Sequence, residues 1–206
     1  MKGLISCLSI MAFMSGCSTI PSTPDPHTEK YTVQVVEVEV PSGVFTFEGG
    51  YPPNIDIESE LFAHPDAVLF EYPIVAAGVG ESVTNDQTKH VVMAEDYSVV
   101  EGKAVAQEKV YKLGSIVSAN INELENGYIY CHTYANRQEL VGFDETIMEN
   151  GERVMIPAIK TRELDMRPLL EPNSWIMIGG LTSQRSDGEN LDLILCLRVI
   201  PPDINE

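Results

Sequence analysis

The sequence is poor in basic residues. Of its 206 residues, 13 are Lys or Arg and 31 are Asp or Glu, which gives a formal net charge of -18. Nucleic acids and anionic lipid head groups are bound by clustered Lys and Arg side chains. The composition therefore argues against a nucleic-acid partner and against a face that docks on acidic lipid. A solvated, acidic surface is expected instead.

The sequence also lacks the common catalytic motifs. It has no G-x-S-x-G, no G-x-x-x-x-G-K and no Cys-x-x-Cys, and its four histidines (27, 64, 90 and 132) show no H-x-x-x-H spacing. Cys131 and His132 are neighbours, but neighbours on a strand point to opposite faces. We therefore predict no catalytic residue, no metal site and no cofactor, and a protein that is not an enzyme.

Helical periodicity is scarce, and strand-like runs take its place. A single short helix is expected over residues 54–63, capped by Asn54 or Asp56. Asn126-Gly127 and Asn150-Gly151 are hairpin signals. Residues 95–108 are expected to be loop or a short helix. The pattern predicts a mainly antiparallel β fold, with strands over residues 31–40, 67–70, 74–77, 89–94, 111–122, 128–135, 143–147, 153–160, 175–178 and 191–200.

Two of these runs show how their faces divide. In residues 191–200, Leu191, Leu193, Leu195, Leu197 and Val199 fall on one face, as period 2 requires. In residues 31–40 the apolar face switches near residues 35–36. A β-bulge there would allow the switch.

The N-terminus has the features of an export signal. Lys2 precedes an apolar run over residues 4–14 that is too short to span a bilayer, and Met14-Ser15-Gly16-Cys17 follows. These last four residues resemble the lipobox of bacterial lipoproteins. The resemblance implies a signal peptide at residues 1–16, acylation (palmitate) on Cys17, and membrane attachment through that anchor. In this family Ser18 implies the outer membrane, facing the periplasm, and the Pro-rich residues up to 30 form a tether.

Two cysteines remain within the β runs, Cys131 and Cys196. An oxidising periplasm would allow a disulfide between them that pins two strands. Alternatively, both are small buried apolar side chains. The residue pattern leaves both interpretations open.

Several blocks, in shared order over about residues 31–201, resemble the C-terminal β-domain of bacterial secretins, the outer-membrane channel subunits of type II and type III secretion and type IV pili. Residues 173–181, ending Gly179-Gly180-Leu181, resemble the segment in which a turn leads into an apolar strand. Residues 67–80 resemble the family's strand–Pro–strand element, and residues 114–130 its Asn-Gly hairpin. The residues that match family motifs are Pro73, Gly80, Gly114, Pro157, Gly179, Gly180 and Leu181.

The sequence also departs from the secretin pattern. Residues 182–190 are expected to form a short polar loop where secretins carry a longer segment, and only the tether precedes Tyr31, so the N-terminal ring-building domains are not expected. The resemblance implies an antiparallel secretin-like β-domain over residues 31–202. It further implies a reduced subunit of, or an accessory to, a protein secretion or pilus-assembly channel, as a homo-oligomer or envelope complex. The alternative is a monomeric periplasm-facing β-sandwich binding lipoprotein with a general cell-envelope role.

Overall fold

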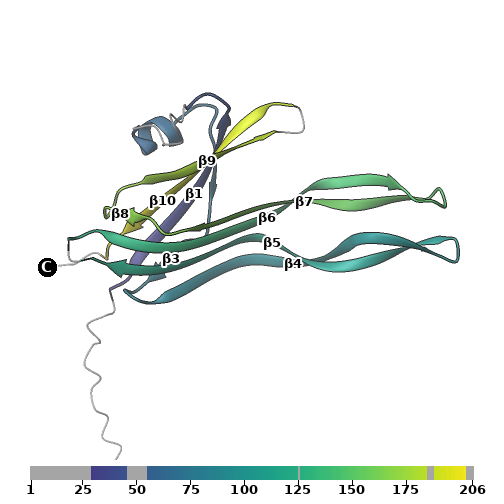
Figure 1. The fold of residues 1–206 in the computed structure, drawn as a ribbon, viewed down its shortest axis with the longest axis horizontal. Coiled ribbons are helices and arrows are strands. Elements are labelled where there is room, and N and C mark those ends of the chain that lie inside the picture. The colour runs from purple at the N-terminus through teal and green to yellow at the C-terminus, as the bar shows by residue number, and fades with distance from the viewer. Residues whose placement is uncertain (1–28, 46–54, 125, 185–187, 203–206) are drawn as a thin grey trace, which may run out of the picture.

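The chain folds into two antiparallel sheets, with two long hairpins extending from the second (Figure 1). The structure is a computed structural model that describes residues 29–45, 55–124, 126–184 and 188–202. The predicted signal peptide and Cys17 lie outside the described residues. The first sheet has the order β2-β1-β10-β9, with β3 also paired to β1, and its strands are β1 (Tyr31–Pro41), β2 (Val68–Glu71), β3 (Val75–Ala77), β9 (Ile176–Gln184) and β10 (Asn190–Ile200).

The second sheet has the order β4-β5-β6-β7, with a short β8 paired to β6. Its strands are β4 (Ser82–Val100), β5 (Lys103–Glu123), β6 (Ile129–Ile147), β7 (Arg153–Met166) and β8 (Leu169–Leu170). All strand pairs in both sheets are antiparallel. The prediction of a mainly antiparallel β fold with one short helix is confirmed.

The helix is a single short π-helical segment, η1 (Ile57–Phe62). Asp56 is its N-cap and accepts hydrogen bonds from the backbone N–H groups of Glu58 and Ser59, so one of the two predicted caps is confirmed. Ile57 and Leu61 face inward and are buried. Among the described residues, no helix has the length and apolarity needed to cross a bilayer.

Strand β1 has no bulge, contrary to expectation. It pairs with β10 in one unbroken register from Thr32↔Ile200 to Pro41↔Leu191. The change of apolar face near Val35 has another cause, because the first sheet is covered on both sides. Tyr31, Val33 and Val35 face the second sheet, whereas Val38 and Val40 face η1.

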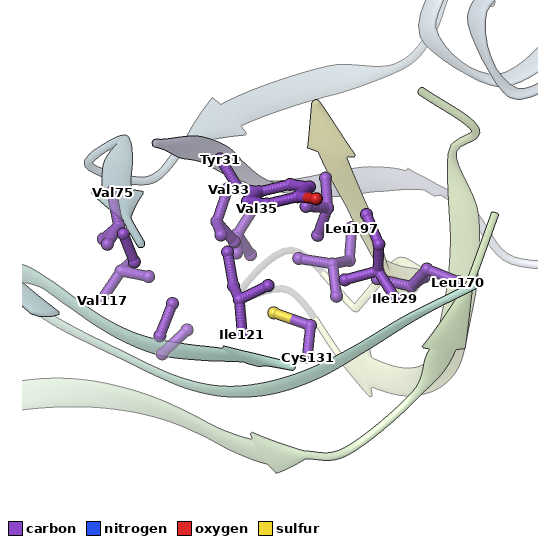
Figure 2. Close-up of a cluster of buried hydrophobic side chains, with 14 of the residues drawn as sticks. Tyr31, Val33, Val35, Val75, Val117, Ile121, Ile129, Cys131, Leu170 and Leu197 are labelled. Atoms are coloured by element: carbon purple, nitrogen blue, oxygen red, sulfur yellow. The ribbon is translucent and has the colours of Figure 1, made fainter. Parts of the chain in front are cut away.

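The main core lies between the two sheets (Figure 2). Val33, Leu197 and Val199 of the first sheet contribute to it, as do Ile121 and Cys131 of the second. A second cluster lies on the other face of the first sheet, next to η1, and its buried members are Val38, Val40, Ile57, Leu61, Met177, Ile194 and Cys196. β10 therefore supplies apolar side chains to both clusters.

The possible disulfide is absent from this structure. Cys131 and Cys196 are free and buried. Cys131 belongs to the core between the sheets, whereas Cys196 belongs to the cluster beside η1, on the opposite face of the first sheet. The sheet therefore separates the two side chains, and the alternative of two small buried side chains describes both cysteines.

Residues 95–108 are strand, so the expectation of loop or a short helix there is wrong. They form the ends of β4 and β5 and a tight turn in which Glu101 and Gly102 have φ values of 51° and 77°. Positive φ at both central residues is typical of a type I′ hairpin turn, whose twist matches that of the strands. β9 likewise continues as paired strand to Gln184, into the expected polar loop.

Candidate assembly interface

The two hairpins separate from each other at Gly114. β5 and β6 pair only from Gly114↔Gln138 to Glu123↔Ile129. Beyond that point each strand pairs only within its own hairpin. We call residues 89–113 the first arm and residues 139–160 the second arm. Both run away from the body in the same direction (Figure 1), and within the described residues the outer strand edges of each arm have no strand partner.

The backbone at the point of separation requires glycine. Its φ is +127°, and a Cβ at this position would lie 2.3 Å from the carbonyl oxygen of Gln87 in β4. Only glycine adopts this conformation at such a close backbone approach without displacing its neighbour. Gly114 is therefore the point at which β5 leaves the sheet and enters the first arm.

Large apolar side chains are exposed along both arms. Phe143, Ile147 and Met155 of the second arm are about half exposed or more. In the first arm, Val92 and Val110 stand directly opposite each other and are 59% and 58% exposed. Other exposed members are Val99, Val100, Val105, Leu140 and Val141. Apolar surface gathered in this way on one part of a molecule commonly marks a contact with another surface.

The far ends of the arms contact each other through three hydrogen bonds. The Asn150 side chain donates to the carbonyl oxygen of Gly102 at 3.0 Å, and the Ala104 N–H donates to the Glu152 carboxylate at 2.7 Å. The Tyr97 hydroxyl donates to the Met155 carbonyl oxygen at 3.3 Å. We call this set the tip contact. Val154, which follows Glu152 and Arg153 into β7, is only 6% exposed.

Where the arms leave the body, a buried ionic cluster joins the two sheets. Arg162 of β7 forms ion pairs with both Glu37 and Glu39 of β1, and the Tyr72 hydroxyl donates to Glu37 at 3.0 Å. Arg137 of β6 stacks on the Phe70 ring, 3.9 Å from its centroid. We call Glu37, Glu39, Tyr72, Arg137 and Arg162 the junction cluster.

The junction cluster is largely shielded from water. The Glu37 side chain is 2% exposed and that of Arg162 12%. Arg162 Nη1 contacts Glu37 Oε1 as an ion pair but without hydrogen-bond geometry. Burial lowers the pKa of the Arg162 guanidinium from its usual value. Charges buried in this way are stable only when paired, so the cluster holds the base of the second arm against β1.

A groove lies on the opposite face of the first sheet, between η1 and β2. It has a volume of about 250 Å³ and is lined in part by Gln34, Phe62 and Leu69. Arg198 lies over the Trp175 ring at 4.5 Å and donates to Gln34 and to Glu58 at 2.8–2.9 Å. The Trp175 indole N–H donates to the same carboxylate at 2.8 Å. The polar groups of the groove are thus paired mainly with one another.

The residues that match secretin motifs are spread through the fold and do not form one site. Pro73 lies between β2 and β3, and Gly80, with a φ of +75°, donates its N–H to the Ile121 carbonyl oxygen at 2.7 Å. Pro157 lies in the second arm, paired with Phe143. Gly179, Gly180 and Leu181 pair with consecutive residues of β10, beside a register shift. Pro73 and Gly80 thus lie in connections between strands, whereas Pro157, Gly179, Gly180 and Leu181 lie within strands.

Tyr130, His132 and Tyr134 alternate along β6 with the buried Ile129, Cys131 and Thr133, so they lie on the face of the second sheet away from the core. His132 of that face contacts Asp165 at 2.8 Å, and the Tyr128 hydroxyl donates to Glu171 at 3.0 Å. Cys131 and His132 therefore do not form a pair. Within the part of the chain that the structure describes, no group of three His, Cys, Asp or Glu side chains is arranged to hold a metal ion.

The junction cluster and the tip contact were not predicted from the sequence. One signal for the junction cluster was present, because Glu37 and Glu39 share a strand face with the apolar residues Tyr31, Val33 and Val35. A carboxylate on an apolar strand face requires a buried cation. The sequence does not identify that cation, because Arg162 lies more than 120 residues away.

No protein-family model and no curated protein matches this chain. Solved structures do. The secretin InvG of the Salmonella SPI-1 type III secretion injectisome aligns with 86% of this chain and 66% of its own, at 8% identity and a TM-score of 0.50. InvG in an atomic model of the injectisome basal body proteins InvG, PrgH and PrgK aligns with 86% of this chain and 47% of its own, at 8% identity and a TM-score of 0.50.

The type II secretin GspD of Escherichia coli K12 aligns with 85% of this chain and 50% of its own, at 10% identity and a TM-score of 0.45. The chain therefore spans less than two thirds of each of these three solved secretin chains. The two InvG neighbours are secretins, not enzymes. At this level of identity the likeness concerns the fold, and the fold of this chain is secretin-like.

Proposed function

We propose that this chain is a secretin-like subunit of, or an accessory to, a protein secretion or pilus-assembly channel, anchored in the bacterial outer membrane by a lipid on Cys17 and facing the periplasm. The observation that carries the proposal is the pair of long arms, whose distal strands have open edges and exposed apolar side chains, on a secretin-like body. Open edges are surfaces on which strands of other chains pair.

The proposed assembly uses the edges and the apolar surface together. Pairing of a distal strand with a neighbouring copy satisfies the free backbone groups and buries side chains such as Phe143 and Val110. The junction cluster supports this role because it fixes the base of the second arm to the body through Arg162. A fixed arm loses less conformational freedom on association than a mobile one.

The lipid anchor and the cellular location are inferred from residues 1–30. The tether over residues 17–30 would hold the β-domain, residues 31–202, near the inner leaflet of the outer membrane. Replacement of Cys17 by Ala is expected to release the protein from the membrane fraction. Membrane retention of the Cys17→Ala variant would contradict the lipid anchor. It would not bear on the assembly proposal, which is tested separately.

The assembly proposal is tested by the mass and shape of the detergent-extracted, full-length protein. Native mass measurement and negative-stain imaging are expected to show closed multimers, alone or with partner proteins from the same envelope. A monomer under all extraction conditions, with no co-purifying envelope protein, would overturn the proposal.

The second candidate function is that of a monomeric binding lipoprotein, which the groove beside η1 favours. The groove presents apolar side chains from Phe62 and Leu69 next to the paired polar groups of Arg198 and Glu58. A clean monomer that binds a small ligand, with affinity reduced by Trp175→Ala, would support this function over a channel role.

A further inference from the structure

We infer that the tip contact is a self-blocking device, which covers the open edge of β5 in the isolated subunit and must open before that edge pairs with another copy. This inference rests on the proposed function, since it concerns the regulation of the same assembly surface. Its basis is the position of Glu152, the turn residue that precedes β7, whose carboxylate accepts a hydrogen bond from a backbone N–H of the other arm.

The Glu152 carboxylate binds a backbone N–H group that strand pairing would use. Ala104 belongs to the distal part of β5, and among the described residues no strand adjoins the side of β5 away from β4 before Gly114. Its N–H donates to Glu152 at 2.7 Å. A strand added along this edge would compete with the carboxylate for that donor, because backbone pairing uses the outward-facing N–H and C=O groups.

A second bond covers the adjoining turn. The Asn150 side chain donates to the Gly102 carbonyl oxygen at 3.0 Å, and both residues lie in the hairpin turns at the ends of the arms. The third bond, from Tyr97 to the Met155 carbonyl oxygen, joins β4 to β7 and lies next to the buried Val154. Each arm thus covers polar backbone groups of the other at its tip.

Charged side chains that cover strand edges are a known way in which β proteins avoid premature pairing. Here the covering carboxylate comes from another hairpin of the same chain, so it can leave when that hairpin moves. A contact that stabilises the closed form and is absent from the assembled form lowers the fraction of subunits that are competent to pair. A high concentration of subunits in the membrane, or a partner that binds the tip, then raises the fraction of subunits in the open, pairing-competent form.

The test compares full-length, detergent-extracted proteins by the fraction of cross-linkable multimers at equal concentration. Glu152→Ala removes the carboxylate and is expected to raise the multimer fraction about threefold to tenfold, the range that the loss of one hydrogen bond supports. Glu149→Ala is the matched control, because Glu149 is an exposed acid of the same turn whose side chain makes no hydrogen bond or ion pair in the described residues. It is expected to match the wild type.

A second variant keeps the test independent of folding defects. The double substitution Ala104→Cys with Glu152→Cys places one thiol on each side of the tip contact, and a short bismaleimide can join them. Unlinked protein is expected to form multimers more readily than the wild type, whereas the linked protein, which has the same sequence, is expected to remain monomeric.

The outcomes separate the inference from the proposed function. If the wild type and both substituted proteins form equal multimer fractions and linking has no effect, the tip contact does not block assembly and the inference is wrong, although the channel proposal stands. If no protein forms multimers under any condition, both fail. Increased assembly of Glu152→Ala, together with its suppression by the linker, supports the inference.

Discussion

Arg137 of β6 and Arg162 of β7 stand directly opposite each other in the second sheet, on the face that meets β1 and β2. Like charges at directly opposed positions destabilise a sheet when they are not compensated. Here Glu139 pairs with Arg137, while Glu37 and Glu39 pair with Arg162. The Phe70 ring lies against both guanidinium groups, at 3.9 and 5.8 Å from its centroid. The two arginines of β6 and β7 would repel each other if unpaired, but the ion pairs of Arg162 instead join β7 to β1.

Substitution of Arg162 by Ala should destabilise the fold strongly. It would leave Glu37, which is 2% exposed, with a buried charge and no cation, and loss of one partner of a buried pair costs about 3–5 kcal/mol. The free energy of unfolding in urea measures the effect. Arg153→Ala is the control, because Arg153 pairs with Glu145 on the surface and its side chain is 74% exposed, so its loss should cost less than about 1 kcal/mol. Equal effects of the two substitutions would show that the junction cluster contributes little.

Gly114→Ala should destabilise the protein and disturb the separation of the arms. The new Cβ would lie 2.3 Å from the Gln87 carbonyl oxygen, at a φ of +127°. Such backbone strain costs on the order of 1–3 kcal/mol before the clash is counted. Gly142→Ala is a matched control, because Gly142 also lies in the second sheet and a methyl group added there would meet no atom within 4 Å. Thermal unfolding of both variants provides the comparison, and a Gly114→Ala protein as stable as Gly142→Ala would contradict the close approach.

Stability should fall as the pH rises from about 10 to 12. Burial raises the pKa of Tyr72 to about 12, and burial together with the hydrogen bond to Glu123 raises that of Tyr31 to about 12. The folded protein therefore keeps both phenols protonated where the unfolded chain ionises them, so their contribution is complete below pH 10 and is lost as the pH approaches 12. Urea unfolding across this range checks the slope.

The tyrosine contribution can be separated from that of the buried thiols, which also titrate at alkaline pH. Tyr31→Phe and Tyr72→Phe each keep both cysteines, and each should lose less stability than the wild type between pH 10 and 12. Tyr111→Phe serves as the control because Tyr111 lies in the first arm, away from the core, and takes no part in the tip contact. Identical pH slopes for all four proteins would contradict the raised pKa values.

The two cysteines of the β-domain should be unreactive in the folded protein and reactive once it unfolds. Burial raises the pKa of Cys196 to about 12 and also raises that of Cys131, so little thiolate is present at pH 8. Titration with a thiol reagent should detect neither thiol before denaturation and both afterwards. A Cys196→Ala variant should then show one. If denaturation without a reductant exposed no thiol in the wild type, the cysteines would be bridged after all.

The sequence was sufficient to locate most strands in the body. Apolar alternation identified β1 and β10, and Asn126-Gly127 and Asn150-Gly151 identified two hairpin turns correctly. These signals are local, because they depend on the period of a strand and on the backbone freedom of a turn.

The distal half of the first arm, residues 95–108, could not be predicted in this way. In residues 95–108 both strand faces remain largely exposed, so acids, lysines and valines follow each other without a clear period. The pairing of β4 with β5 maintains the strands there, and that information lies in the partner strand. Long-range contacts also explain two other misses. The change of apolar face in β1 has its cause in the different layers that cover its two faces. The role of Arg162 depends on carboxylate partners that are distant in sequence.

The pairing of β1 with β10 also determines the order in which the molecule can fold. Ser42, directly after β1, bonds to Asp192 of β10 across 150 residues, whereas β4 and β5 are joined by a two-residue turn. Closure of so long a loop is entropically costly, and folds that depend on distant contacts form slowly. The hairpins of the second sheet can therefore form early, and β1 can pair with β2 and β3, but the first sheet is complete only when β10 joins it. Until then the edge of β1 that pairs with β10 stays open, so a chaperone that shields this edge would protect the protein during the interval in which the tendency to aggregate is greatest.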